Sequence, residues 1–170
     1  FILDSDAQAR GPINLRSCVS RNFIECCVKM IFIPNLPVND GLSRPVKVTY
    51  PDEGSLLNPR YPAPCNMYVR PSQITTSVVV RALARALPGR VPAPSSAAGG
   101  SLASAGLNPR TGKWYAQYEI LNGGGGARPD ADGVSAQDEL VVNVMNTPVE
   151  AIETEFPVRI ERYELRQDSA

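Results

Sequence analysis

The sequence predicts a mixed α/β fold in which two core helices pack on a mixed sheet, with long proline- and glycine-rich loops between them. Three observations support this class. Segments at about 15–32 and 72–87 carry apolar residues at helical spacing. Shorter segments alternate apolar and polar residues, as half-buried strands do. The 16 prolines and 13 glycines interrupt the chain between these segments.

A short strand and the first helix open the chain. Residues 1–4 read as a strand, and Gly-Pro-Ile-Asn at 11–14 breaks it. From residue 15 to residue 32, apolar positions recur every three or four residues, and Pro34 and Pro37 end the pattern. The predicted buried stripe of this helix comprises Leu15, Val19, Phe23, Cys26, Cys27, Met30 and Ile31.

A turn at 38–41, an alternating strand at 44–50 and a proline-rich loop at 57–64 lead to the second helix. Ser72 is its expected N-cap, and Pro88 with Gly89 ends it. Arg81 and Arg85 lie four residues apart on its polar side, where they are either solvated or in contact with a partner. Its predicted buried stripe comprises Ile74, Val78, Ala82, Leu83, Ala86 and Leu87.

The second half of the chain is richer in loops. Residues 92–109 contain many Pro, Ala, Ser and Gly, so we expect a flexible or partner-contacting loop there. An aromatic strand is predicted at 113–120, and a run of four glycines follows at 123–126. Pro148 opens a short helical turn at 149–155, and residues 158–166 alternate as a closing strand.

The composition excludes several classes of function. Seventeen basic residues balance 17 acidic ones and are scattered, so no basic field attracts nucleic acid or an anionic membrane. No apolar run approaches the ~20 residues that a membrane span needs. The four cysteines form no Cys-x-x-Cys pair, which favours reduced, packed thiols and a cytoplasmic protein.

The absence of histidine is the most informative count. It removes the usual general base near neutral pH and the commonest metal ligand, so we expect no metal site in this chain. It also excludes Ser-His-Asp and Cys-His machinery within these residues. The chain opens on Phe1 as if a strand were already under way, and we expect an interior segment of a larger protein without a complete catalytic centre.

The glycine run resembles a phosphate-binding loop only superficially. A P-loop needs a Lys and a Ser or Thr at the start of the next helix, and here Ala127, Arg128 and Pro129 follow instead. A backbone-permissive turn is the simpler interpretation. Such glycines also let the main chain approach a ligand or another subunit closely, with Arg128 as an anion contact.

Five segments that occur in order resemble the hydantoinase B family, which includes N-methylhydantoinase B subunits, 5-oxoprolinases and acetone or acetophenone carboxylase subunits. The resemblance covers nearly all 170 residues. The segments are Gly-Pro-Ile-Asn at 11–14, Glu-Gly-Ser-Leu-Leu-Asn-Pro-Arg at 53–60, Leu-Pro-Gly-Arg-Val-Pro-Ala at 87–93, Gly-Gly-Gly-Ala-Arg-Pro at 124–129, and Asn-Thr-Pro-Val-Glu at 146–150 with the strand pattern that ends at 166.

The resemblance implies one segment, residues 1–170, of a larger hydantoinase B-like subunit. Such a subunit would work in an ATP-dependent hetero-oligomer whose hydantoinase A-type partner phosphorylates a small cyclic amide, and a divalent metal is implied for the full complex. Hydrolysis of hydantoin-like or 5-oxoproline-like amides is preferred over carboxylation of the acetone or acetophenone type. A non-catalytic structural or interaction module is the alternative from another class.

The same resemblance suggests residues near the family's cleft or subunit interface. Glycines would allow close backbone approach, the arginine would contact an anion or a partner, and the remaining side chains would form a hydrogen-bonding scaffold. Relatives often carry a histidine pair where this chain has Asp138 and Leu140, so that role does not carry over. The candidates are Gly124, Gly125, Arg128, Asn143, Asn146 and Glu150.

Overall fold

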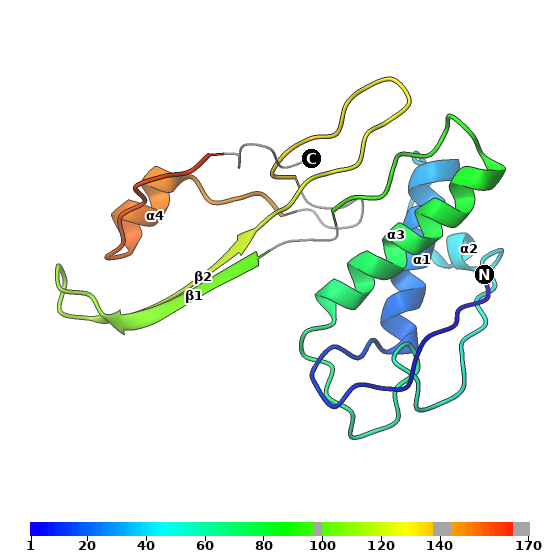
Figure 1. Ribbon diagram of the computed structural model, residues 1–170, viewed down its shortest axis with the longest axis horizontal. Coiled ribbons are helices and arrows are strands. Elements are labelled where there is room, and N and C mark those ends of the chain that lie inside the picture. Colours follow the sequence, from blue (N-terminus) through cyan, green and yellow to red (C-terminus); the bar gives the residue numbers. More distant parts are fainter. Residues whose placement is uncertain (97–99, 138–143, 165–170) are drawn as a thin grey trace.

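Figure 1 shows the computed structural model, which describes residues 1–96, 100–137 and 144–164. These residues form helices α1 (Ser17–Phe32), α2 (Asp40–Ser43), α3 (Val69–Ala86) and α4 (Val149–Glu155), and strands β1 (Gly100–Leu107) and β2 (Trp114–Leu121). The predicted mixed α/β class is confirmed, and both long helices lie close to their predicted ranges. None of the described helices is long and apolar enough to cross a membrane.

The sheet differs from the predicted mixed sheet beneath the helices. Within the described ranges it consists of β1 and β2 alone, paired antiparallel from Gly100↔Leu121 to Leu107↔Trp114. This hairpin extends away from α1 and α3, which pack on each other instead. Among the described residues, the two predicted N-terminal strands add nothing to this sheet, because they meet each other through a single parallel bridge between Ile2 and Thr49.

The hydrophobic core lies between α1 and α3. Ile24 and Cys27 of α1 meet Val79 and Val80 of α3, and all four side chains are at most 2% exposed. Val46 joins them from the segment after α2. Each such side chain contributes roughly 1.5–3 kcal/mol on burial. The helix pair therefore holds the N-terminal half together without support from the sheet.

The segment at 44–50 keeps its predicted alternation although it is not a strand. Val46, Val48 and Tyr50 face inward, while Lys47 and Thr49 are exposed. The amide of Leu3 donates to the carbonyl of Thr49 at 2.9 Å, and the amide of Thr49 donates to the carbonyl of Phe1 at 2.9 Å. These two bonds tie the start of the chain to the core but are too few to form a ladder.

The buried face of α3 is only partly the predicted one, because Leu83 and Leu87 pack against the core as expected but the first half of the stripe does not. Ile74 and Val78 are 54% and 57% exposed, whereas Thr75 and Thr76 are buried. The threonine hydroxyls donate to the carbonyls of Pro71 and Ser72 at 2.8 and 3.0 Å, so their polarity is satisfied within the helix. A threonine bonded in this way packs as a small apolar residue.

The start of α3 also differs from expectation. The helix begins at Val69, and Ser72 lies inside its first turn rather than at the N-cap. The hydroxyl of Ser72 donates back to the carbonyl of Tyr68 at 2.7 Å. In α1, Leu15 and Cys27 are buried as predicted. Elsewhere the buried positions are Ser20 and Ile24, and Cys26 is exposed.

Asn14 closes the loop that precedes α1. Its side chain is fully buried, and its Oδ1 accepts a hydrogen bond from the amide of Ala9 at 2.8 Å. Its Nδ2 donates to the carbonyls of Ala9, Gly11 and Pro64 at 2.9, 3.1 and 2.8 Å. One amide therefore joins the Gly-Pro-Ile-Asn turn to the proline-rich loop 50 residues later.

The predicted loop at 92–109 contains a strand, so the expectation of a loop is wrong over β1. The sequence Gly-Ser-Leu-Ala-Ser-Ala-Gly-Leu has few strand-favouring residues. It forms a strand because it pairs along its whole length with the aromatic β2, which lies close to the predicted strand at 113–120. The contact of this region with a partner remains a prediction.

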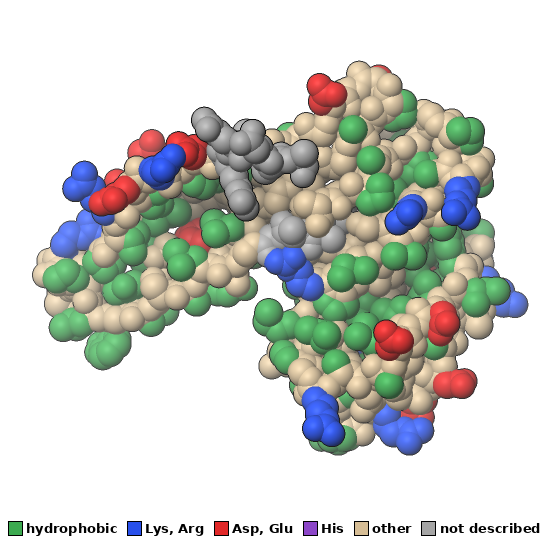
Figure 2. All heavy atoms as spheres, viewed as in Figure 1, with side chains coloured by type: hydrophobic (Ala, Val, Ile, Leu, Met, Phe, Trp, Pro, Cys, Tyr) green, Lys and Arg blue, Asp and Glu red, His purple; other side chains and the backbone are tan. Residues whose placement is uncertain are grey.

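The two faces of the hairpin have different surroundings. Tyr115 and Gln117 lie on the face near the C-terminal segment, where the ring of Tyr115 lies 6.1 Å from that of Phe156. Trp114 and Tyr118 lie on the opposite face and are 80% and 66% exposed. Figure 2 shows hydrophobic side chains along this arm of the molecule. One side of the hairpin is thus uncovered and apolar.

The C-terminal helix is confirmed, but the strand after it is not. α4 follows Pro148 as predicted, with Pro148 itself in the N-cap position. Residues 158–164 form no strand, and the amide of Ile160 instead donates to a carboxylate oxygen of Glu153 at 2.7 Å. These residues alternate in sequence but form no strand, because neither β1 nor β2 pairs with them.

Of the cysteines predicted to be packed thiols, Cys27 is buried and Cys65 is half-buried, whereas Cys18 and Cys26 are exposed. Partial burial raises the pKa of Cys26, Glu25 raises it further and Lys29 opposes the change. The folded state therefore favours the neutral thiol of Cys26, and this contribution to stability is lost as the pH rises through the folded pKa.

We expect alkylation of Cys26 to begin at higher pH in the native chain than in urea. Mass spectrometry of the peptide that contains Cys26 measures the extent of alkylation at each pH. The same pH profile in the native chain and in urea would refute the prediction.

Candidate functional site

The glycine-rich segment after β2 folds back on itself. The amide of Gly125 donates to the carbonyl of Val134 at 2.8 Å, and the amide of Ala136 donates to the carbonyl of Gly123 at 2.7 Å. Arg128 and Ala131 exchange backbone hydrogen bonds at 2.8 and 3.3 Å and close the far end. We call this segment, residues 123–136, the glycine loop; it follows β2 at the end of the hairpin next to the helices (Figure 1).

Residues 93–96 cover the other edge of the glycine loop. The amide of Ala93 donates to the carbonyl of Ala127 at 2.7 Å, and the amide of Ser96 donates to the carbonyl of Gly124 at 3.0 Å. The hydroxyl of Ser96 accepts from the amide of Gly124 at 3.1 Å. The segment that leaves α3 is thus fixed to the segment that leaves β2, and the glycine loop joins the two halves of the chain.

Close approach between main-chain segments of this junction occurs at two further glycines. A Cβ on Gly126 would lie 1.9 Å from the carbonyl oxygen of Ala93, and one on Gly133 would lie 2.5 Å from that of Gly125. At Gly124 and Gly125 the nearest atom would be 3.4 and 3.9 Å away. Gly126 and Gly133 are therefore required by the fold, whereas a Cβ on Gly124 or Gly125 would make only ordinary contact with the carbonyl oxygen of Val134 among the described residues.

Asn146 is brought to the base of the glycine loop. Its Oδ1 accepts from the amide of Asn122 at 3.2 Å, and its Nδ2 donates to the hydroxyl of Tyr163 at 2.8 Å. The side chain of Asn122 donates to the carbonyl of Val144 at 2.8 Å. The Oδ1 of Asn122 is buried and accepts no hydrogen bond from the described residues. The side chain of Asn146 therefore links its own segment to those of Asn122 and Tyr163.

The other predicted residues lie apart from this base. Arg128 is exposed at the far end of the glycine loop, with its Nε 3.8 Å from Asp130. Glu150 is exposed on α4. That helix is held near the β1–β2 turn by Arg110, which donates to the carbonyls of Glu153 at 2.9 Å and of Phe156. Asn143, Asp138 and Leu140 lie outside the described residues.

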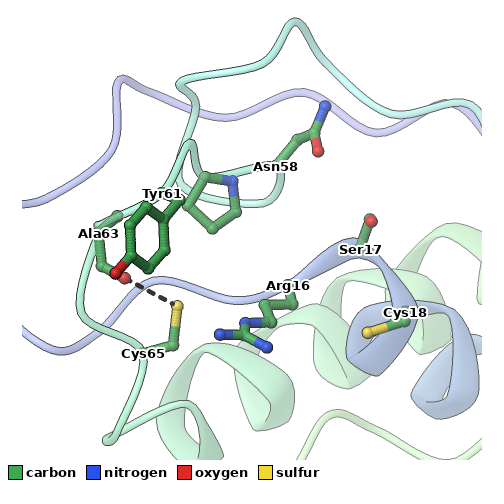
Figure 3. A pocket seen from close by; sticks show the side chains of 8 residues that line it. Arg16, Ser17, Cys18, Asn58, Tyr61, Ala63 and Cys65 are labelled. Carbon is green, nitrogen blue, oxygen red and sulfur yellow. Dashed lines mark hydrogen bonds between the residues drawn. The ribbon is translucent and has the colours of Figure 1, made fainter.

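A pocket of about 260 Å³ lies at the start of α1 and contains none of the predicted site residues. Arg16 lies between the two thiols in Figure 3, and the thiol of Cys65 donates to the carbonyl of Ala63 at 3.4 Å. No side chain caps the helix here. The lining residues are Arg16, Ser17, Cys18, Asn58, Pro59, Tyr61, Ala63 and Cys65.

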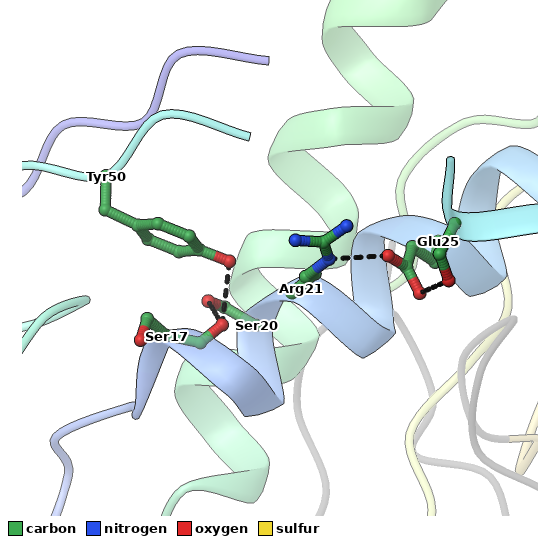
Figure 4. Close-up of polar contacts among 6 residues, drawn as sticks. Ser17, Ser20, Arg21, Glu25 and Tyr50 are labelled. Atoms are coloured by element: carbon green, nitrogen blue, oxygen red, sulfur yellow. Dashed lines mark hydrogen bonds and ion pairs between the residues drawn. The ribbon is translucent and has the colours of Figure 1, made fainter. Parts of the chain in front are cut away.

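A buried carboxylate lies further along α1 and was not anticipated. Glu25 is 9% exposed; it accepts from Arg21 at 2.7 Å and from the hydroxyl of Ser43 at 2.8 Å (Figure 4). The carboxylate raises the pKa of Arg21 through this hydrogen bond and its charge. Because one oxygen of Glu25 accepts from Arg21 of α1 and the other from Ser43 of α2, the carboxylate fastens α2 to α1.

The described residues offer no metal-binding cluster, and the glycine loop lacks the features of a phosphate-binding loop. Within the three described ranges, no group of three or more His, Cys, Asp or Glu side chains could hold a metal ion. The glycine loop lacks the following helix whose N-terminus would face a phosphate. The described part of the chain therefore supports no chemical step through either group.

The match to a known protein family decides which family the chain belongs to. The family described as hydantoinase B/oxoprolinase matches residues 2–170. The chain belongs to the hydantoinase B/oxoprolinase family. The resemblance noted in the sequence is thus confirmed.

Curated and solved members support the same assignment. The chain is 36% identical over 137 residues to the B-type component of a "Putative D-/L-hydantoinase" from Pseudomonas sp. (strain NS671), covering 80% of this chain and 22% of that protein. It is 34% identical to the beta chain of caprolactamase from Pseudomonas jessenii, covering 78% and 24%. The crystal structure of ATP-dependent caprolactamase from that organism matches with a TM-score of 0.86 and 30% identity, covering 99% of this chain and 30% of that one.

This hydantoinase B segment spans less than a third of the length of these relatives. Within it, the sequence pointed to the glycine loop and to Asn146, which the fold joins through Asn122. Sequence reasoning missed Asn122, Ser96 and Tyr163, because their contacts connect positions 17 to 28 residues apart. Asn122 alone had a signal, since it directly precedes the glycine run.

Proposed function

We propose that this chain is a scaffold segment of a hydantoinase B-type subunit in an ATP-dependent enzyme that hydrolyses small cyclic amides. The single observation that carries the proposal is the match of 99% of the chain to ATP-dependent caprolactamase at a TM-score of 0.86. Relatives named for hydantoin, 5-oxoproline and caprolactam support amide hydrolysis over carboxylation. The partner would be a hydantoinase A-type subunit, in a cytoplasmic hetero-oligomer that uses ATP and a divalent metal.

The residues described above suggest how the segment contributes. Gly124 and Gly125 would present main chain to a ligand or partner, and Asn146 fixes their base through Asn122. Arg128 is exposed and its ion pair is long, so its guanidinium is free to meet an anion. Glu150 lies on α4, away from the glycine loop, and fits a subunit contact better than the same cleft. Asn143 keeps its proposed scaffold role.

A turnover assay tests this proposal. The polypeptide that carries this segment is purified with its A-type partner and incubated with hydantoin, 5-oxoproline or caprolactam, with and without ATP. We expect ring opening that requires ATP, and none from the 170-residue chain alone. ATP-independent hydrolysis, turnover by the isolated chain, or a carboxylated product formed from bicarbonate would contradict the proposal.

One observation favours a second candidate. The chain has no histidine, so the segment itself offers no general base of the usual kind. A non-catalytic interaction module would bind the same partner but leave all three cyclic amides intact in the presence of ATP. Stable co-purification without any turnover would favour this module over the enzyme subunit.

A further inference from the structure

Asn122 is the only asparagine of the 170 residues that is followed by glycine. Asparagine is one of the chemically labile residues. Before a glycine it is especially so, because the main-chain nitrogen of a residue without Cβ can reach the side-chain amide carbon unhindered. The pair directly follows β2, which ends at Leu121, and opens the glycine loop. Its chemical stability therefore bears on how the two halves of the chain stay joined.

The nitrogen of Gly123 is not held by the fold. Among the described residues its amide donates no hydrogen bond. The amides on either side are both engaged. That of Asn122 donates to Oδ1 of Asn146 at 3.2 Å, and that of Gly124 donates to the hydroxyl of Ser96 at 3.1 Å. Both residues of the pair are only half-buried, so water has access to them.

The side-chain amide of Asn122 is held at its nitrogen only. Its Nδ2 donates to the carbonyl of Val144 at 2.8 Å, whereas its Oδ1 is buried and accepts no hydrogen bond from the described residues. The bond to Val144 opposes any reaction in which this nitrogen leaves. One such neutral hydrogen bond slows the step by roughly two- to tenfold. The fold therefore restrains Asn122 without protecting it.

We propose that Asn122 is a site of spontaneous deamidation, a covalent change that unfastens the base of the glycine loop. The nitrogen of Gly123 gives up its proton to solvent and forms a bond to Cγ of Asn122. The bond from Cγ to Nδ2 then breaks, and the leaving nitrogen takes up a proton from water and departs as ammonia. Water opens the resulting cyclic imide at either carbonyl, which leaves aspartate or isoaspartate in place of the asparagine. Water is the only other reactant.

The product cannot keep the link to Val144. A carboxylate has no hydrogen to donate, so two acceptor oxygens replace the bond from Nδ2. The carboxylate also brings a charge to the place where Oδ1 is buried without a donor, which is unfavourable. In isoaspartate the main chain is longer by one carbon, which shifts the glycine loop relative to β2. Either product weakens the connection between β2 and the segment that carries Asn146.

Ageing of the complete polypeptide that carries this segment tests the proposal. The native protein is incubated in heavy-oxygen water at mildly alkaline pH and digested, and mass spectrometry follows each asparagine. We expect Asn122 to convert faster than Asn35, Asn39 and Asn66, which are exposed but precede larger residues. The product should carry heavy oxygen, because water opens the imide, and the rate should rise with pH, because the attacking nitrogen must lose its proton.

Two alanine substitutions provide the matched control. Gly123→Ala hinders the attack and should slow conversion severalfold. Gly124→Ala adds a Cβ that lies 3.4 Å from its nearest neighbour and keeps the asparagine–glycine pair, so the rate should not change. Urea, which frees the side chain from Val144, should accelerate conversion by about two- to tenfold.

The comparison within the wild-type protein decides the outcome even if Gly123→Ala fails to fold. Conversion of Asn122 no faster than that of Asn35, Asn39 and Asn66, or conversion in urea alone, would overturn the proposal. So would equal rates in the wild type and a folded Gly123→Ala variant.

The structural consequence has a separate test. Asn122→Asp reproduces one product and should unfold at a lower temperature than the wild type, with faster hydrogen exchange of the Gly125 amide in the glycine loop. Asn39→Asp makes the same chemical change where the side chain only accepts a bond, from the amide of Gly41, and should unfold as the wild type does. Equal unfolding temperatures of the two variants would show that deamidation does not unfasten the loop.

Discussion

Asn14→Ala should lower the free energy of unfolding of the chain by about 3–5 kcal/mol, because each buried polar group left unpaired costs roughly 1–3 kcal/mol. The substitution orphans the amide of Ala9 and the carbonyls of Ala9, Gly11 and Pro64, all in one loop junction. For a chain of this size the melting temperature should fall by roughly 10 °C. Urea and thermal unfolding followed by circular dichroism measure both quantities.

Two companion variants give the Asn14 prediction its controls. Asn14→Asp keeps an acceptor for Ala9 but loses every donor, so it should be at least as harmful. Asn39→Ala removes the exposed cap of α2, which accepts one bond from Gly41 at 2.9 Å, and should cost about 1 kcal/mol or less. Equal destabilisation by Asn14→Ala and Asn39→Ala would show that the buried network contributes nothing special.

Gly126→Ala should detach residues 93–96 from the glycine loop. The new Cβ would lie 1.9 Å from the carbonyl oxygen of Ala93 and 2.7 Å from that of Pro94, so the backbone must move. Forcing atoms into a packed site typically costs about 1–3 kcal/mol. Hydrogen exchange of the Ala93 and Ser96 amides, which donate to Ala127 and Gly124, reports the loss of contact directly.

Glycines in different surroundings separate this clash from a general effect of alanine. Gly11→Ala adds a Cβ with no atom within 4 Å, and Gly125→Ala adds one whose nearest contact is 3.9 Å. Neither glycine has a positive φ, so both substitutions should leave the exchange rates near those of the wild type. Protection of Ala93 and Ser96 that survives in Gly126→Ala would contradict the close approach.

The sequence could predict those elements whose own residues show a regular apolar spacing or are bounded by prolines. α1, α3, β2 and α4 follow from spacing and prolines, and lie close to their predicted ranges. The buried faces were harder, because hydroxyl groups such as those of Thr75 and Thr76 become compatible with the core only once they bond to their own helix. β1 was missed because its pairing with β2, rather than its composition, makes it a strand.

In the candidate site, too, local sequence patterns could be predicted and contacts between distant segments could not. A run of glycines is visible in the sequence, but the close approach occurs at Gly126 and Gly133, which only the contacts with other segments reveal. Asn146 could be selected from its sequence pattern, whereas its partner Tyr163 could not. Glu150 was grouped with the glycines through the family resemblance, yet its helix lies away from the glycine loop.

The uncovered hairpin face also provides an optical signal. Trp114 is the only tryptophan of the 170 residues and is 80% exposed. Its emission therefore reports the polarity of one known point, without any label or substitution. A partner that covers this face should shift the emission to shorter wavelength and protect the indole from a soluble quencher, whereas binding confined to α3 should leave the spectrum unchanged. The chain thus carries its own fluorescent probe for distinguishing contacts on the hairpin from contacts on the helices.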